Sequence, residues 1–293
     1  MIVVERTGPL ATVQDLGRPG LAHLGVGRSG AVDRPALRLA NRLVGNAEDA
    51  AAVEVTLGGL VLRFERAATV ALTGAPCTVL VSGRPYAADA PVPVRAGETL
   101  ALGVPAWGLR SYLAVRGGGA VGPVLGSRST DVLSGVGPPP LAPGTRLPVG
   151  SPDGPYGGVE LVSVRPAHGT PLRVWPGPRD DWFADDALPL LTGQDWEVTP
   201  VSDRVGMRLR GRALPRRRLG ELPSEGMVEG ALQVPPDGQP VLFLADHPVT
   251  GGYPVVAVVD PADLPLAAQA RPGERLRFTL APGSGAAGRG TAP

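Results

Sequence analysis

The sequence predicts a mainly β fold built from many short strands joined by tight turns, and three observations support this prediction. The 293 residues include 42 glycines and 34 prolines, which stand between short apolar runs and so have the distribution of turn residues. The apolar runs follow one another too closely for the helical crossovers of a parallel α/β fold. Segments far apart in the chain also resemble each other, which indicates two related halves. We therefore expect a meander or barrel of short strands in each half.

The clearest predicted strands lie in the first third of the chain. Four apolar runs are separated by Gly-Gly, Glu-Arg-Ala and Gly-Ala-Pro, and they cover residues 55–57, 61–64, 69–72 and 78–81. Such spacing is typical of consecutive antiparallel strands.

Two short helices interrupt this β pattern. Asp33 is suited to be a helix N-cap, Pro35 to the first turn, and Gly45 to the end of a helix whose apolar face lies within residues 37–44. Capping and ligand contact both remain open as roles for Asp33. A shorter helical segment is expected between residues 180 and 193.

An internal duplication is visible in short echoes. Residues 94–100 resemble residues 270–276, and the same turn recurs at 142–147. A looser echo relates residues 28–34 to residues 201–206. Residues 150–158 have the composition of a linker, so we predict an N-terminal half over 1–155 and a C-terminal half over 156–281. The Gly/Ala/Ser-rich residues 282–293 are expected to be a disordered tail.

Charge and hydropathy exclude several function classes. The net charge of +1 offers no general attraction to nucleic acid or to an anionic membrane. No apolar run approaches the roughly 18 residues of a membrane helix, and the first residues lack the regions of a signal peptide. We expect a soluble, cytoplasmic protein with neither nucleic acid nor membrane as partner.

The absence of lysine excludes more chemistry than the charge does. All 28 basic residues are arginine, so Schiff-base catalysis, a Walker-type phosphate lysine and biotinylation of this chain are excluded. The single cysteine, Cys77, cannot form an intramolecular disulfide, and the three histidines have no metal-ligand spacing. We expect no metal site.

The segment 13–20 is the first candidate for a binding site. Its glycines allow the backbone to approach a ligand, Arg18 can hold carboxylate or phosphate oxygens with two donors, and Gln14 and Asp15 can orient an amide. His23 could move a proton near neutral pH. The alternative is structural: an ion pair between Arg18 and Asp15, with His23 merely hydrogen-bonded.

A second candidate is the hydroxyl-rich segment 126–131, which contains Arg128 and Ser129. Backbone amides and hydroxyls converge in such turns and can cradle an anion. Capping of neighbouring backbone by the same hydroxyls explains the pattern equally well.

The later candidates lie in the predicted C-terminal half. Arg204 and Arg208 are spaced to share one face of a helix or strand, whereas Arg216–Arg218 have the pattern of a solvated loop. Glu225 could supply an acid/base pair together with Glu54, and Tyr253 follows two glycines in a hairpin suited to ligand contact. No nucleophilic triad is recognisable.

The motifs of residues 12–20, 29–41, 54–59, 126–131, 202–206, 224–226 and 250–254 together resemble the C subunit of 5-oxoprolinase. This family is also called the allophanate-hydrolase-subunit-2-like, or biotin-dependent carboxyltransferase, family. The resemblance implies two tandem cyclophilin-like β-barrel domains with a few short helices. It also implies ATP-dependent opening of the 5-oxoproline lactam to glutamate, a hydrolase reaction on a cyclic amide. That reaction is carried out only in a complex with the A and B subunits of 5-oxoprolinase, where ATP is bound by the complex.

Two other functions stay open. The first is the carboxyltransferase part of a urea-carboxylase or allophanate-type enzyme, with biotin on a separate carrier protein. The second is a non-catalytic regulatory subunit that binds a kinase or another enzyme.

The resemblance implies a site at the matching motif positions. We expect Arg18, Glu54, Arg128 and Glu225 to be catalytic. We expect substrate contacts from Gln14, Asp33, Asn41, Ser129, Asp203, Arg204 and Tyr253.

Overall fold

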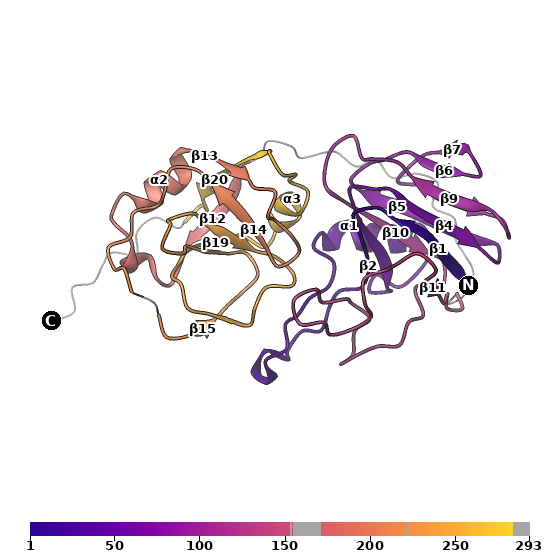
Figure 1. Ribbon diagram of the computed structural model, residues 1–293, viewed down its shortest axis with the longest axis horizontal. Coiled ribbons are helices and arrows are strands. Elements are labelled where there is room, and N and C mark those ends of the chain that lie inside the picture. The colour runs from indigo at the N-terminus through magenta and orange to yellow at the C-terminus, as the bar shows by residue number, and fades with distance from the viewer. Residues whose placement is uncertain (153, 155–170, 221, 284–293) are drawn as a thin grey trace. The chain divides into compact units, whose positions relative to one another are not determined.

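The computed structural model describes residues 1–152, 154, 171–220 and 222–283, and the chain divides into two compact units, Met1–Pro166 and Ala167–Pro293 (Figure 1). We call these the N-terminal unit and the C-terminal unit. The predicted boundary between residues 155 and 156 lies outside the described residues. Pro282 and Gly283 form a turn, and the rest of the predicted disordered tail is also outside the described part.

The N-terminal unit consists of two antiparallel sheets. In spatial order, the first contains β11 (Arg146–Leu147), β1 (Ile2–Thr7), β4 (Leu60–Phe64), β9 (Thr99–Leu102), β6 (Val79–Val81) and β7 (Arg84–Tyr86). The second contains β2 (Leu10–Gln14), β3 (Ala52–Thr56), β10 (Arg110–Val115), β5 (Ala68–Gly74) and β8 (Pro91–Val94). The four strands predicted within residues 55–81 correspond to β3, β4, β5 and β6.

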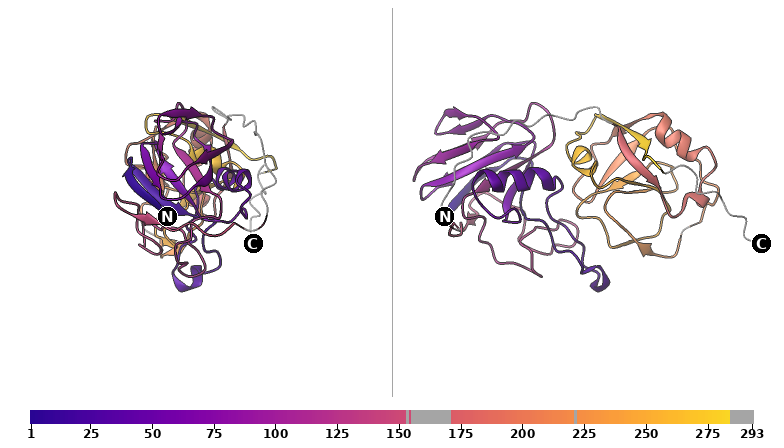
Figure 2. Two further views of the ribbon diagram at one scale, coloured as in Figure 1. Left: turned by 90° about the vertical axis from the view of Figure 1, so that its right-hand side faces the viewer. Right: turned by 180° about the vertical axis from the view of Figure 1, so that it is seen from behind.

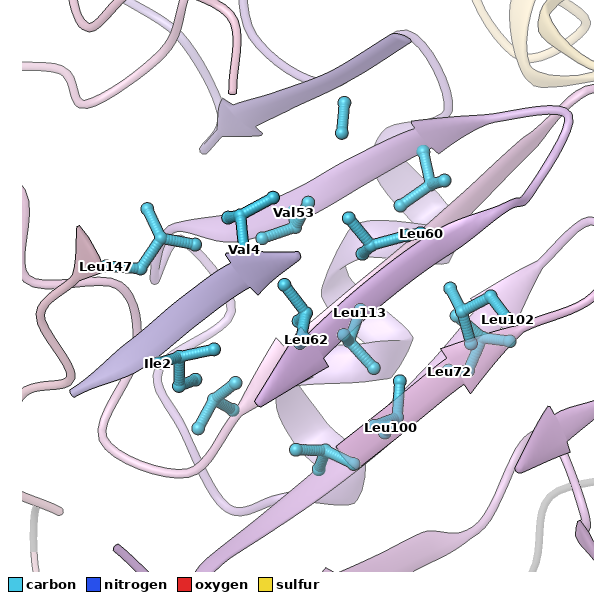
Figure 3. Close-up of a cluster of buried hydrophobic side chains, with 14 of the residues drawn as sticks. Ile2, Val4, Val53, Leu60, Leu62, Leu72, Leu100, Leu102, Leu113 and Leu147 are labelled. Atoms are coloured by element: carbon cyan, nitrogen blue, oxygen red, sulfur yellow. The ribbon is translucent and has the colours of Figure 1, made fainter. Parts of the chain in front are cut away.

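Both sheets contribute to one hydrophobic core (Figure 3). Leu62 of β4 and Leu100 of β9 come from the first sheet, and Val53 of β3, Leu72 of β5 and Leu113 of β10 come from the second. Burying these aliphatic side chains supplies the main driving force that holds the sheets together.

Helix α1 (Arg34–Leu43) adds a second, smaller core beside the five-stranded sheet (Figure 2). The Asp33 carboxylate accepts a hydrogen bond of 3.0 Å from the Ala36 N–H, so the predicted N-cap is confirmed. Leu37 and Ala40 are fully buried and belong to the same cluster as Tyr112 of β10. Local capping and burial of one face therefore produce this helix together.

The C-terminal unit contains a closed barrel. Its strands, in spatial order, are β12 (Leu172–Pro176), β19 (Val255–Val259), β16 (Ala231–Gln233), β17 (Val241–Phe243), β14 (Gly206–Arg210), β13 (Asp195–Val198) and β20 (Arg275–Leu280). The barrel closes where β12 pairs in parallel with β20. A separate small ladder joins β15 (Glu225–Gly226) to β18 (Thr250–Gly251).

The helical segments described in this unit are short. They are the 3-10 turn η2 (Asp180–Trp182), α2 (Ala187–Gly193) and α3 (Leu264–Ala268). The helical segment predicted over 180–193 is thus divided in two, because Phe183 is extended and its side chain is buried. The prediction of a mainly β fold with few short helices is confirmed.

One turn recurs three times and gives the sequence echo a structural basis. In each copy the first residue and the fourth exchange hydrogen bonds: the fourth N–H donates to the first carbonyl, and the fourth side chain accepts from the first N–H. These pairs are Arg95 with Glu98, Ala142 with Thr145 and Arg271 with Glu274. The third residue of each copy is a glycine, and its N–H donates to a backbone carbonyl of a neighbouring strand. The acceptors are Phe64, Val4 and Val198 respectively. Two copies lie in the N-terminal unit and one in the C-terminal unit.

The helices within residues 1–152, 154, 171–220 and 222–283 are all too short or too polar to span a membrane.

Candidate functional site

The loop that follows β2 is closed by its own backbone. Arg18 N–H donates to the Arg28 carbonyl at 2.8 Å, and Ala31 N–H donates to the Asp15 carbonyl at 2.9 Å. A Cβ atom at Gly17 would lie 2.5 Å from the Ser29 carbonyl oxygen, and Gly17 has a positive φ of 83°. Glycine is therefore required where the two arms of the loop cross. Between the arms, the chain carries the 3-10 turn η1 (Ala22–Leu24) outward from the sheets (Figure 1).

The Asp15 carboxylate is the centre of this loop. Its Oδ1 accepts hydrogen bonds from the hydroxyls of Ser127 (2.6 Å) and Ser129 (2.5 Å) and from the Gly17 N–H (2.8 Å), and its Oδ2 accepts from the Arg128 N–H (2.6 Å). Asp15 is only 7% exposed. The donors of the anion cradle predicted at 126–131 therefore bind a carboxylate of the same chain. Burying a carboxylate costs free energy unless such donors surround it.

Arg18 does not pair with Asp15, so the predicted structural ion pair is wrong. Its side chain is 2% exposed, and its Nη2 donates to the Ser129 carbonyl at 2.5 Å while its Nε donates to the Val124 carbonyl at 3.4 Å. Carbonyl oxygens neutralise only part of a buried guanidinium charge. The Arg18 guanidinium can therefore still bind a further acceptor.

Three buried polar atoms beside this loop lack a hydrogen-bond partner within the described residues. They are Arg18 Nη1, Gln14 Oε1 and Thr130 Oγ1. The three side chains are neighbours. Gln14 Nε2 donates to the Thr130 carbonyl at 2.9 Å, and Arg18 donates to the carbonyl of the adjacent Ser129. Unsatisfied polar atoms are uncommon in protein interiors, and their concentration marks a place for water or a polar ligand. These atoms define the polar cluster of the N-terminal unit.

Glu54 lies in a second buried group beneath the start of α1. Its Oε2 accepts from the Tyr112 hydroxyl at 2.8 Å and from the Val32 N–H at 3.1 Å, and its Oε1 lies 3.7 Å from Arg110 Nε. The Tyr112 hydroxyl also accepts from the Asp33 N–H at 2.8 Å. Burial, followed by the nearby carboxylates of Glu54 and Asp33, raises the pKa of Tyr112 well above its usual value. These contacts hold the segment before α1, and a catalytic role for Glu54 stays a prediction.

Two other predicted residues have clear structural contacts. Asn41 is fully buried, donates to the Ala50 carbonyl at 2.7 Å and accepts from Asn46 Nδ2 at 3.1 Å, so it fixes the connection from α1 to β3. Arg128 Nε donates to the Val121 carbonyl at 2.8 Å from a half-buried position. His23 is exposed, with its Nδ1 3.1 Å from the Gly20 carbonyl oxygen.

In the C-terminal unit, Arg204 forms a buried two-pronged ion pair with Asp246. The distances are 2.9 Å from Nε to Oδ2 and 3.0 Å from Nη2 to Oδ1, and both side chains are at most 1% exposed. Asp203 is exposed and accepts from the N–H groups of Val205 and Gly206. The expectation that Arg204 and Arg208 share one face is wrong, because Arg204 precedes β14 and is buried whereas Arg208 is exposed.

Glu225 and the segment before Tyr253 lie together in the β15–β18 ladder. Glu225 pairs in register with Gly251, and Arg179 binds its carboxylate with two nitrogens. These hydrogen bonds from Arg179 lower the pKa of Glu225. Tyr253 is half-buried, and its carbonyl accepts from Gln233 Nε2 at 3.1 Å.

The structure thus brings Gln14, Arg18, Arg128 and Ser129 into one cluster and Asp33 and Glu54 into another, with Asn41 apart from both. Glu54 and Glu225 belong to different units, so the acid/base pair stays a prediction.

Several partners of these residues were not predicted from the sequence: Arg110, Tyr112, Arg179 and Asp246. The one local signal is polar side chains inside an apolar strand, as at Arg110 and Tyr112 of β10. Arg179 and Asp246 contact residues in distant segments, and such contacts leave no local pattern.

Comparison with known proteins gives a consistent picture. The family model described as "Carboxyltransferase domain, subdomain A and B" matches residues 24–280. The C subunit of 5-oxoprolinase from Escherichia coli (strain K12) is 39% identical over 95% of this chain and 90% of its own length. The urea amidolyase of Saccharomyces cerevisiae is 30% identical over 94% of this chain and 16% of its own length.

Solved structures share the fold. The crystal structure of TTHA0988 is 38% identical with a TM-score of 0.87, and this chain spans 55% of that chain, about half its length. The crystal structure of the K. lactis urea amidolyase is 30% identical with a TM-score of 0.88, over 95% of this chain and 18% of that one.

Proposed function

Because the chain belongs to the family of the carboxyltransferase domain, subdomain A and B, we propose that it is the C subunit of an ATP-dependent 5-oxoprolinase. In this proposal it acts in a complex with the A and B subunits, and the complex opens the 5-oxoproline lactam to glutamate. The observation that supports it most is the likeness to the 5-oxoprolinase C subunits of Escherichia coli and Haemophilus influenzae, at 39% and 35% identity over more than nine tenths of the chain.

The polar cluster of the N-terminal unit suits an amide substrate with a carboxylate. Gln14 Oε1 is an acceptor for a lactam N–H, Arg18 Nη1 is a charged donor for a carboxylate or carbonyl oxygen, and the Thr130 hydroxyl can donate or accept. All three atoms are covered, so a substrate reaches them only when the surrounding loops move. We therefore place the substrate's polar groups at this cluster.

ATP belongs elsewhere in the proposed complex. The only hydroxyl-rich loop predicted to hold an anion uses its donors on Asp15, and the chain has no lysine, so this loop does not fit the phosphates of ATP. We assign ATP to the complex. Opening an unreactive amide requires ATP to activate the lactam, and this chain contributes groups that orient the substrate and stabilise developing charge.

The direct test is reconstitution. The chain is purified with its A and B partners, and glutamate released from 5-oxoproline is measured with and without ATP. We expect ATP-dependent release that requires all three proteins. The absence of glutamate from a well-assembled complex would overturn the proposal.

Thr130→Val tests the polar cluster without disturbing its shape. The substitution removes a buried hydroxyl that has no partner among the described residues, so the fold should be as stable as before or more so. We expect turnover to fall at least tenfold. Thr145→Val, at a half-buried turn position outside the polar cluster, is the control for turnover. An active and stable Thr130→Val complex would remove Thr130 from the site.

A second candidate is carboxyl transfer in a urea-carboxylase-like enzyme, which is favoured by the family description and by the likeness to urea amidolyases. Biotin would then be attached to a separate carrier, since this chain has no lysine. Carboxylation of urea by the chain with a carboxybiotin-loaded carrier, and no glutamate from 5-oxoproline, would select this function.

A further inference from the structure

A cavity of about 540 Å³ opens on the N-terminal unit, and none of the predicted site residues lines it. Its volume lies within the roughly 300–1,000 Å³ typical of small-molecule pockets. We propose that this cavity binds a small amphipathic organic anion, with a carboxylate or phosphate group on an apolar body. The proposal does not depend on the reaction that the chain serves.

Three neighbouring strands each bring one arginine to this cavity. In the five-stranded sheet β5 lies between β10 and β8, with Val70 opposite Val115 and Ala68 opposite Val94. Arg116 directly follows β10, Arg66 comes two residues before β5, and Arg95 directly follows β8. Register therefore places all three arginines at the same end of these strands, and all three line the cavity.

Among the described residues, no acidic side chain lines the cavity. Two of the three arginines, Arg66 and Arg95, are also not paired with carboxylates in the described part of the chain. By contrast, Arg63, Arg84 and Arg146 of the same unit each pair with a glutamate. Guanidinium groups without a protein partner are suited to bind carboxylate or phosphate oxygens.

The remaining lining is largely apolar and determines the second half of the ligand. Met1, Ala67 and Pro93 are exposed in this lining, and Val149 is half-buried. A purely inorganic anion would leave the exposed apolar lining in contact with water, whereas an apolar body would cover it. The lining therefore favours an organic anion over phosphate alone.

Fluorescence titration of the full chain with 8-anilinonaphthalene-1-sulfonate tests the proposal, because this probe joins a sulfonate to an apolar ring system. We expect saturable binding that Arg66→Ala/Arg95→Ala weakens at least tenfold. Arg6→Ala removes another exposed arginine of this unit and should change the affinity less than twofold. N-phenyl-1-naphthylamine lacks the sulfonate, and the double substitution should leave its binding unchanged.

A second variant keeps the test independent of the charged residues. Ala67 is exposed and lines the cavity, so Ala67→Trp should fill it and weaken binding of the sulfonate probe at least tenfold without changing the charge. Equal affinity of the wild type and both cavity variants would overturn the proposal. An equal loss in Arg6→Ala would do the same, since binding would then follow general surface charge.

Discussion

The two units each bury a carboxylate that joins distant loops, but they neutralise it differently. Asp15 in the N-terminal unit accepts from two hydroxyls and two backbone N–H groups. Asp246 in the C-terminal unit faces the guanidinium of Arg204. The first arrangement distributes the charge over several neutral donors, whereas the second includes a full counter-charge from an arginine.

This difference predicts how each unit responds to damage. Loss of a single neutral donor leaves Asp15 with the others, so the cost is limited. Loss of Arg204 leaves a buried carboxylate without its counter-charge, which is much more expensive. The N-terminal unit has a further feature, because Arg18 does not pair with Asp15 and its Nη1 has no partner among the described residues.

The largest expected effect is at Arg204. Arg204→Met should lower the free energy of unfolding of the C-terminal unit by about 3–5 kcal/mol, measured by denaturant titration with hydrogen exchange to locate the loss. Arg208→Met, at an exposed position, should stay within about 0.5 kcal/mol of the wild type. Arg204→Met/Asp246→Leu should recover most of the loss, and a double variant no more stable than the single one would argue against an isolated charge as the cause.

Cys77 reports on the N-terminal unit alone, because it is the only cysteine of the chain. Burial raises the pKa of its thiol from 9.0 to about 11. At pH 8 this reduces the reactive thiolate about a hundredfold, so iodoacetamide should label the native chain about a hundred times more slowly than the unfolded chain. The native rate should keep rising with pH beyond 9, and equal rates at pH 8 would contradict the raised pKa.

Asp15→Asn tests the distributed arrangement. The amide keeps the shape but loses the charge and presents an N–H group to donors, so we expect the N-terminal unit to lose about 1.5–3 kcal/mol. Exchange protection should fall in residues 126–131 and not in the C-terminal unit. Asp49→Asn, at an exposed position, is the control, and a similar loss in both variants would show that the charge of Asp15 has no special role.

The smallest expected effect compares the helix caps of the two units. Asp33 caps α1 with its side chain, whereas Asp186 at the start of α2 makes no such hydrogen bond. Asp33→Ala should therefore cost about 1 kcal/mol, and Asp186→Ala should cost less. Asp33→Ser should restore part of the stability. Equal losses at the two helices, measured by thermal unfolding, would mean that the cap bond contributes little.

Local patterns in the sequence determine much of this protein. The N-cap at Asp33, the strands within residues 55–81 and the recurring turn depend on neighbouring residues, so the sequence alone predicts them. The likeness of many separate motifs to one family was visible in the same way. Backbone propensity, capping and turn geometry act over a few residues and leave a readable pattern.

Tertiary structure decides what each polar residue contacts. The partners of Asp15 include Ser127 and Ser129, more than a hundred residues away, and Glu54 meets Tyr112 across 58 positions. From the sequence, the hydroxyls of 126–131 suit an outside anion and capping of the backbone equally well, because nothing local places Asp15 among them. Strand pairing and loop packing between segments far apart in the chain decide which buried charges are satisfied, as at Asp15. They also decide which atoms lack a partner in the described part of the chain, as at Arg18 and Thr130.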